Sequence, residues 1–176
     1  ELATGNEPTE LLEAADRLRK ELHGDHFDLC SIINARSGKC SENCKFCAQS
    51  SRYQTEIETY DIISYEEVRR QGLENKSYGV HRYSLVTAGR EVSDEDIETF
   101  ALMYGQLGHE GELYFCASMG FLTREKADRL VTAGVKRYHC NLETCRSFFP
   151  RICTTHTWEE KVETIRIARA AGMDIC

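Results

Sequence analysis

The sequence contains no apolar run that approaches the roughly 18 residues of a membrane-spanning helix, and it contains no block of clustered lysine and arginine. The first absence argues against a membrane protein. The second argues against nucleic acid as the main partner, because phosphate binding needs grouped positive charge, and the net charge of −7 agrees with this. The opening residues ELATGNEPTE also lack the basic and then apolar order of a secretory signal. We therefore expect a cytoplasmic protein with no membrane or nucleic-acid partner.

Cysteine, by contrast, is abundant, with nine residues in the chain of 176. In a reducing compartment they would stay as thiols, and an odd number does not favour a disulfide framework. Cys40, Cys44 and Cys47 fall within the stretch KCSENCKFCAQSSRY at 39–53. Clustered thiolates bind zinc or iron–sulfur clusters. The set is one ligand short of a closed structural zinc site, and the next cysteine is Cys116.

A cubane iron–sulfur cluster explains this shortage. Three cysteines can hold three irons and leave the fourth iron open for a ligand that takes part in chemistry, as open catalytic zinc sites do. The same spacing would also place three small apolar side chains on one stripe of a helix. The residues between the cysteines are mostly Ser, Glu, Asn and Lys, however, and they suit a loop better than a helical core.

Strand patterns alternate with helix patterns along the chain, which implies parallel strands joined by right-handed crossovers. The expected strands cover residues 27–35, 80–89, 111–118 and 135–143, and a fifth begins at 173. The expected helices cover residues 9–24, 64–77, 94–108, a stretch that starts near 123, and 158–172. Capping residues precede or open these helices: Thr9, Ser64 with Glu67, Ser93 with Asp96, and Thr157 with Glu160.

Such a repeat either closes into a (β/α)₈ barrel or opens into a doubly wound sheet. Cys116, Cys140 and Cys176 fall near the ends of successive predicted strands or within them, as a barrel active site requires. A doubly wound sheet would gather its site at one switch point, and no GxGxxG follows any strand. Since a complete barrel takes about 250 residues, we expect a single α/β domain over 1–176. It would be a TIM-type barrel truncated to about its first five strands, with both chain ends representing cuts.

The motif Cys40-x-x-x-Cys44-x-Phe46-Cys47 resembles the cluster loop of the radical S-adenosylmethionine (SAM) superfamily. The resemblance implies a [4Fe–4S] cluster on these three cysteines, with SAM on the open iron. An electron from the cluster would cleave a C–S bond of SAM and give methionine and a 5′-deoxyadenosyl radical.

Over residues 10–176 the sequence resembles the biotin synthase family more closely. The stretches that carry this resemblance are CSIINARSGKCSENCKFCAQSSRY and RYHCNLETCRSFFPRICTTHTWEEKVETIRIARAAGMDIC. It implies insertion of sulfur into dethiobiotin to make biotin. It also implies a flavodoxin- or ferredoxin-type electron donor and a homodimer.

The same family carries an auxiliary iron–sulfur cluster inside the barrel as the sulfur donor. Cys116 and Cys176 match two of its cysteines, whereas Ser84 occupies the place of the third. Because Cys140 and Cys145 are additional thiols near this region, we hypothesise that they join Cys116 and Cys176 in a rebuilt cluster, either [2Fe–2S] or a four-iron type. The resemblance implies that family members with such a changed cysteine set belong to anaerobes. The alternative, that Cys140 or Cys145 is a packed bystander, stays open.

Further site residues follow from the resemblance alone. The positions expected to bind SAM are Phe46, Thr87, Asn141, Glu143 and Lys161. His139 and Asn141 would contact the substrate. Lys161 stands where the family has an arginine, so it keeps the charge and loses the bidentate fork; a solvated helix lysine is the alternative.

Two other interpretations stay open. One is a different radical enzyme on the same scaffold, such as a hydrogenase-cofactor maturase, which should lack the strand-positioned thiols Cys116 and Cys176. The other is a zinc or iron–sulfur binding module without turnover. Cys30 and Cys153 have no metal partner by spacing, and we predict that they are buried structural thiols.

Overall fold

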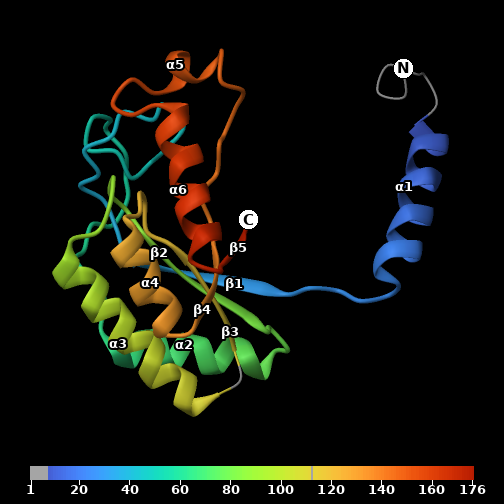
Figure 1. Ribbon diagram of the computed structural model, residues 1–176, viewed down its shortest axis with the longest axis horizontal. Coiled ribbons are helices and arrows are strands. Elements are labelled where there is room, and N and C mark those ends of the chain that lie inside the picture. Colours follow the sequence, from blue (N-terminus) through green and yellow to red (C-terminus); the bar gives the residue numbers. More distant parts are fainter. Residues whose placement is uncertain (1–7, 112) are drawn as a thin grey trace.

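Five parallel strands form one sheet in the sequential order β1-β2-β3-β4-β5 (Figure 1). This computed structural model describes residues 8–111 and 113–176. Because a doubly wound sheet reverses its order after the first strands, the sequential order is that of a barrel wall, and the predicted fold class is confirmed. The strands are β1 (Cys30–Arg36), β2 (Arg82–Thr87), β3 (Tyr114–Ser118), β4 (Val135–Tyr138) and β5 (Asp174–Ile175).

Helices follow the strands and cover one face of the sheet (Figure 1). Tyr83 of β2 points to that face, because its hydroxyl donates to the Val68 carbonyl at 3.1 Å. Tyr83, Leu85, Phe100, Leu107 and Leu130 are all fully buried there. The helices are α2 (Tyr65–Ser77), α3 (Asp94–Glu110), α4 (Arg124–Thr132), α5 (Phe149–Ile152) and α6 (Trp158–Ala170). No helix in the described ranges is long and apolar enough to cross a membrane.

Local capping sets where most of these helices begin. Ser93 and Asp96 form a reciprocal capping box at α3, and Thr157 and Glu160 form another at α6. The Ser64 hydroxyl accepts from the Glu67 amide at the start of α2. These predicted helix starts are confirmed. The structure adds α5, which lies within the connection expected between the fourth strand and the last helix, and it ends β4 at Tyr138, five residues before the predicted end at 143.

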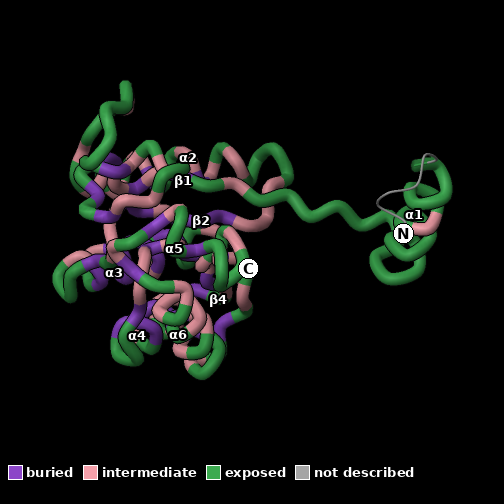
Figure 2. Tube along the Cα trace, turned by 90° about the horizontal axis from the view of Figure 1, so that it is seen from above, coloured by how far each residue is buried: buried purple, intermediate pink, exposed green. Residues whose placement is uncertain are grey.

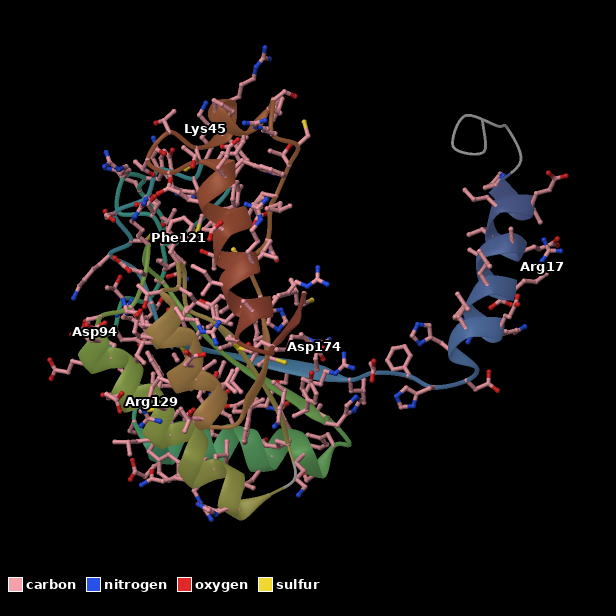
Figure 3. All side chains as sticks on the ribbon, viewed as in Figure 1. Arg17, Lys45, Asp94, Phe121, Arg129 and Asp174 are labelled. Atoms are coloured by element: carbon pink, nitrogen blue, oxygen red, sulfur yellow. The ribbon has the colours of Figure 1, made fainter. Side chains whose placement is uncertain are left out.

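The first helix, α1 (Pro8–His23), lies apart from the sheet and its helices (Figures 1 and 2). None of its described residues is buried, and side chains such as Arg17 project into solvent (Figure 3). The predicted helix is present, but the prediction that Thr9 caps it is wrong. Thr9 lies inside the helix, whose described residues already include Pro8, a residue that suits a first turn because it has no amide hydrogen to leave unpaired.

The face of the sheet opposite the helices corresponds to the interior of a barrel. Side chains alternate along a strand, so the residues next to Tyr83 and Leu85 point to this face. The strand register places Ile32, Ser84, Cys116, Arg137 and Asp174 side by side in one row across it. We call this the lumen face. Cys116 and Ser84, two residues that the sequence linked to the auxiliary cluster, are neighbours in this row.

Candidate functional site

A cavity of about 510 Å³ opens where the loops after the strands converge. In a parallel barrel, the carboxyl ends of the strands are where active sites assemble. The loop after β1, the turn after β2 and the start of α6 all contribute to its wall (Figure 3, where Lys45 marks the first loop and Phe121 the wall). Of the predicted site residues, the cavity is lined by Cys40, Cys44, Phe46, Cys47, Thr87, Cys140, Glu143 and Lys161.

The cysteine loop after β1 is folded on itself by backbone hydrogen bonds. The Cys40 amide donates to the Gln49 carbonyl at 3.1 Å, and the Cys40 carbonyl accepts from the Ser51 amide at 2.8 Å. The Cys47 amide donates to the Cys44 carbonyl at 3.1 Å and closes a turn. No helix forms over this stretch, so the interpretation of the three cysteines as a helical stripe is wrong. The loop instead brings all three thiols to the wall of one cavity.

Glu42 ties this loop to the segment that precedes α6. Glu42 is 7% exposed, and its carboxylate accepts from the Thr155 hydroxyl at 2.7 Å and from His156 Nδ1 at 2.5 Å. Arg90 approaches the same carboxylate at 3.5 Å. Burial alone would raise the pKa of Glu42, but the hydrogen bonds from His156 and Thr155 outweigh it and hold the pKa below its ordinary value. The carboxylate therefore stays charged and keeps the loop in place.

Several polar groups in the cavity are set up to meet a ligand. The Thr87 hydroxyl is buried and has no hydrogen-bond partner in the described part of the chain. Glu143 has a φ of 65°, a left-handed conformation that is strained for a non-glycine residue and that is found often at functional sites. Lys161 brings a positive charge to the same cavity. Asn141 neighbours Glu143 in the loop after β4 and is not among the residues that line the cavity.

Two of the thiols that line the cavity, Cys44 and Cys140, have a pKa above that of a free cysteine. Burial, together with the nearby Cys153 thiol, raises the pKa of Cys44 to about 12. Burial also raises the pKa of Cys140, and the Lys161 charge opposes it. The Cys140 sulfur lies 3.7 Å from the Lys161 carbonyl oxygen. Cys140 therefore belongs to the cavity that holds the three cysteines.

A second group of chemically active residues occupies the lumen face. Cys116 is 2% exposed, and burial raises its pKa to about 11. Its neighbour in the register is Ser84, whose hydroxyl is buried without a partner in the described residues. Arg137 Nε and His139 Nε2 are likewise buried without a partner there. Unpaired buried polar atoms are uncommon. The unpaired atoms on this face are therefore available to form hydrogen bonds with a bound ligand.

Two further cysteines come from the same sheet as Cys116: Cys30 is the first residue of β1, and Cys176 directly follows β5. The sequence predicted that Cys176 joins Cys116, but it did not indicate Cys30. Negative charge on Cys30 or Cys176 adds to the effect of burial and raises the pKa of Cys116 further. Cys30 lies two residues before Ile32 in β1, and side chains two residues apart in a strand point to the same face, so Cys30 points to the lumen face. It is exposed, which makes the prediction of a buried structural thiol wrong for Cys30. Cys145 lies in the loop after β4, exposed and 3.4 Å from the Ser147 hydroxyl.

Cys153 is buried, as predicted, but it has a neighbour that spacing did not indicate. Its sulfur lies 3.7 Å from the Cys44 sulfur, although the two residues are 109 positions apart. His156 completes the group, with its Nδ1 atom 3.3 Å from the Cys153 sulfur. The Cys-x-x-His spacing of Cys153 and His156 is the signal that could have identified this pair as possible metal ligands.

A comparison with models of known protein families shows to which family this chain belongs. The model of the Radical SAM superfamily matches residues 35–176. The chain belongs to the radical SAM superfamily. The superfamily prediction made from the cysteine loop is confirmed.

The radical SAM chain is also similar to curated biotin synthases. The biotin synthase of Desulfotalea psychrophila is 52% identical over 166 residues, which cover 94% of this chain and 49% of that protein. The biotin synthase of Acetivibrio thermocellus is 49% identical over 177 residues, which cover 100% of this chain and 55% of that protein. The predicted resemblance to the biotin synthase family is confirmed. The chain spans about half the length of these relatives.

Solved structures agree on the fold. Methylornithine synthase (PylB) superposes with a TM-score of 0.85 at 20% identity, over 99% of this chain and 51% of that one. HydG, a maturase of the [FeFe]-hydrogenase, superposes with a TM-score of 0.81 at 18% identity, over 99% of this chain and 40% of that one. At such low identity these likenesses support the architecture alone.

Proposed function

We propose that the protein containing this chain is a biotin synthase, which inserts sulfur into dethiobiotin. The observation that carries the proposal is the presence of two thiol-bearing sites on one barrel wall. Cys40, Cys44 and Cys47 line the open cavity, and Cys116 lies on the lumen face beside unpaired polar groups. A radical enzyme without a sulfur donor would need the first site and not the second. Similarity to curated biotin synthases supports the same choice.

The residues of the cavity fit a [4Fe–4S] cluster and SAM. When bound, the cluster supplies the electron that cleaves a C–S bond of SAM. Lys161 offers a cation for the SAM carboxylate, and Glu143 offers acceptors for its ribose hydroxyls. The unpartnered Thr87 hydroxyl is free to bind a further polar group of SAM. Phe46 lines the cavity and would cover part of the bound cofactor from water.

The lumen face fits an auxiliary cluster. We place Cys116 and Cys176 in its ligand set, as the sequence predicted, and we add Cys30, which reaches the same face from β1. Cys30 would then supply the thiolate that Ser84 lacks. Cys140 and Cys145 were predicted to join this set; Cys140 lines the SAM cavity, and Cys145 is exposed on a loop. His139, with a free Nε2 atom, and Asn141 are the proposed contacts of dethiobiotin.

The proposal is tested on the anaerobically purified full-length protein. Iron and sulfide are counted, and 5′-deoxyadenosine and biotin are measured after addition of SAM, reductant and dethiobiotin. Cys47→Ser should lose about four irons and both products. Cys116→Ser should lose the auxiliary iron and biotin but keep 5′-deoxyadenosine. A Cys116→Ser protein that still makes biotin, or wild type that makes 5′-deoxyadenosine without biotin, would favour the maturase-like alternative or another radical reaction. Wild type that makes neither would support a binding module.

The ligand set is tested separately by iron counts and Mössbauer spectra. Cys30→Ser should remove the auxiliary signal and leave the SAM-binding cluster intact. Cys140→Ser and Cys145→Ser serve as matched thiol controls and should leave the iron count unchanged. An unchanged count for Cys30→Ser, with a loss for Cys140→Ser, would restore the predicted ligand set and exclude Cys30.

The partners implied by the resemblance complete the proposal. We propose a flavodoxin- or ferredoxin-type protein as the electron donor and a homodimer for the full-length protein. Biotin formation with reduced flavodoxin in place of a chemical reductant tests the donor. Sedimentation equilibrium of the full-length protein tests the dimer, and a monomer mass at micromolar concentration would exclude it.

A further inference from the structure

Cys44, Cys153 and His156 form a compact group of metal-ligating side chains that the proposed reaction does not use as a unit. Their ligand atoms all lie within 4.8 Å of one another. The two thiols come from segments 109 residues apart, so the fold itself creates the group. We propose that these three side chains bind a single divalent transition-metal ion, zinc or iron(II), in protein that has not yet received its iron–sulfur cluster.

The distances suit tetrahedral coordination. Metal–sulfur bonds of about 2.3 Å and metal–nitrogen bonds of about 2.0–2.1 Å put neighbouring tetrahedral ligands roughly 3.5–3.8 Å apart. The Cys44 and Cys153 sulfurs are 3.7 Å apart, and His156 Nε2 is 3.7 Å from the Cys153 sulfur. Both separations match those of neighbouring ligands in a tetrahedral site, and the third pair lies within the 4.8 Å that encloses the whole group. A water molecule from the cavity can supply the fourth ligand.

The surroundings of His156 prepare its ring for a metal. Nδ1 lies 2.5 Å from the Glu42 carboxylate, so it donates its hydrogen there and leaves the Nε2 lone pair free. A carboxylate behind a histidine is the usual support of a metal-binding imidazole. Phe121 and Phe149 pack against the ring with centroids 5.3 and 5.5 Å away. The ring is thus held in one orientation, and its residue is only 8% exposed.

The position of Cys44 determines how a metal ion reaches the group and why the ion competes with the [4Fe–4S] cluster. Cys44 and His156 both line the 510 Å³ cavity, so an ion can reach the group from there. Cys44 also belongs to the trio that we assign to the [4Fe–4S] cluster. One sulfur at this position cannot serve a mononuclear tetrahedral site and a cluster in the same geometry. The bound ion and the cluster should therefore exclude each other.

The first experiment uses full-length protein stripped of iron under anaerobic, reducing conditions and titrated with Co²⁺ as the probe. A tetrahedral Co²⁺ spectrum with sulfur charge-transfer bands should appear at one equivalent. Cys153→Ser and His156→Ala should each abolish it, whereas Cys40→Ser and Cys47→Ser should keep it. Loss in Cys40→Ser and Cys47→Ser, with no change in Cys153→Ser, would place the ion on the cysteine trio and overturn the proposal.

X-ray absorption of the zinc-loaded wild type gives an answer that does not depend on a variant that folds. Two sulfur ligands and at least one imidazole nitrogen are expected. Three sulfur ligands without imidazole would overturn the proposal. Neither measurement needs SAM or dethiobiotin, so failure of the proposed biotin synthase activity would leave this test unaffected.

Competition is measured as the rate of cluster reconstitution after one equivalent of Zn²⁺ has been added. Zinc should slow reconstitution of the wild type by at least tenfold and should have little effect on Cys153→Ser, which retains Cys40, Cys44 and Cys47. Cys145→Ser is the control with an exposed thiol removed, and it should behave as the wild type. Equal slowing in wild type and Cys153→Ser would show that the inhibiting zinc ion does not need Cys153 and would overturn the proposed site.

Discussion

Gly120 shows how a single residue shapes the cavity. Its φ of 77° lies in the left-handed region, and a Cβ atom there would overlap the Arg90 carbonyl group. The next amide, that of Phe121, donates to the same carbonyl at 2.9 Å. Gly120 and Arg90 both line the cavity. The close approach of these two backbones therefore forms part of the wall, and only glycine permits it.

Gly120→Ala should lower the free energy of unfolding by about 2 kcal/mol or more, because it adds backbone strain and a steric clash. Gly105→Ala is the matched control. Its Cβ would meet no atom within 4 Å, and alanine in helix α3 should stabilise the protein by about 0.5–1 kcal/mol. Urea unfolding of both variants measures the difference. Equal stability of the two variants would show that the loops do not approach as described.

Removing or restoring the positive charge of Lys161 tests whether this residue binds SAM in the proposed site. Lys161→Ala should raise the KM for SAM roughly tenfold, about 1.4 kcal/mol of binding, with a smaller effect on kcat. Lys161→Arg should restore binding, because the guanidinium keeps the charge and adds a second donor. Lys136→Ala, an exposed lysine of β4, is the control. An unchanged KM in Lys161→Ala would support the interpretation of Lys161 as a solvated helix lysine.

At the scale of secondary-structure elements, a polar cluster joins helix α2 to the end of α3. The Tyr65 hydroxyl donates to one Glu110 oxygen at 2.7 Å, and Arg69 pairs with the other. The hydrogen bond from Tyr65, followed by Arg69, lowers the pKa of Glu110. Burial and the Glu110 charge raise the pKa of Tyr65 to about 12. The cluster is therefore held together while Glu110 is ionised.

Glu110→Gln should destabilise the protein at pH 7 and have little effect in acid. A carboxyl with a lowered pKa in the folded state stabilises the fold above its unfolded pKa, 4.5, and this contribution is lost as the pH falls through the folded pKa. The difference in unfolding free energy between wild type and variant should thus shrink from pH 7 to pH 3. Urea unfolding at these values measures it, with Glu13→Gln on α1 as a control of equal charge. A difference independent of pH would mean that Glu110 acts through packing.

At the scale of the whole molecule, α1 stands apart from the barrel wall (Figure 2). It has no buried residue, and its Leu12, Leu18 and Leu22 side chains are exposed. Helices in proteins gain most of their stability from packing, so α1 should contribute little to the fold of this chain.

Removing residues 1–24 from the 176-residue chain should therefore change the free energy of unfolding by less than about 0.5 kcal/mol. Removing residues 1–33, which takes away four of the seven residues of β1, is the control and should destabilise the sheet strongly. Urea unfolding of the two shortened chains measures both effects. A clear loss of stability from the shorter deletion would show that α1 packs against the barrel in solution.

Local chemistry was enough to predict the main elements. The starts of α2, α3 and α6 depend on a side chain and an amide three residues apart, which is a distance that the linear order shows directly. The cysteine trio was recognisable for the same reason, since its three thiols lie on one short loop. The alternation of strands and helices also predicted a parallel sheet, because sequential strands of this kind pair with their neighbours.

Contacts between distant segments needed the folded chain. Cys44 meets Cys153 across 109 residues, and Cys30 reaches the lumen face because β1 pairs with β2 in one particular register. No periodicity marks such contacts, and a shift of one residue in register would turn Cys30 to the opposite face. Whether another segment covers the apolar side chains of a helix is also decided by packing. The sequence therefore predicted that α1 is a helix, but it did not predict that α1 lies apart from the sheet. Residue spacing therefore identified the chemistry of this protein, while strand register and loop packing determined which thiols share a site.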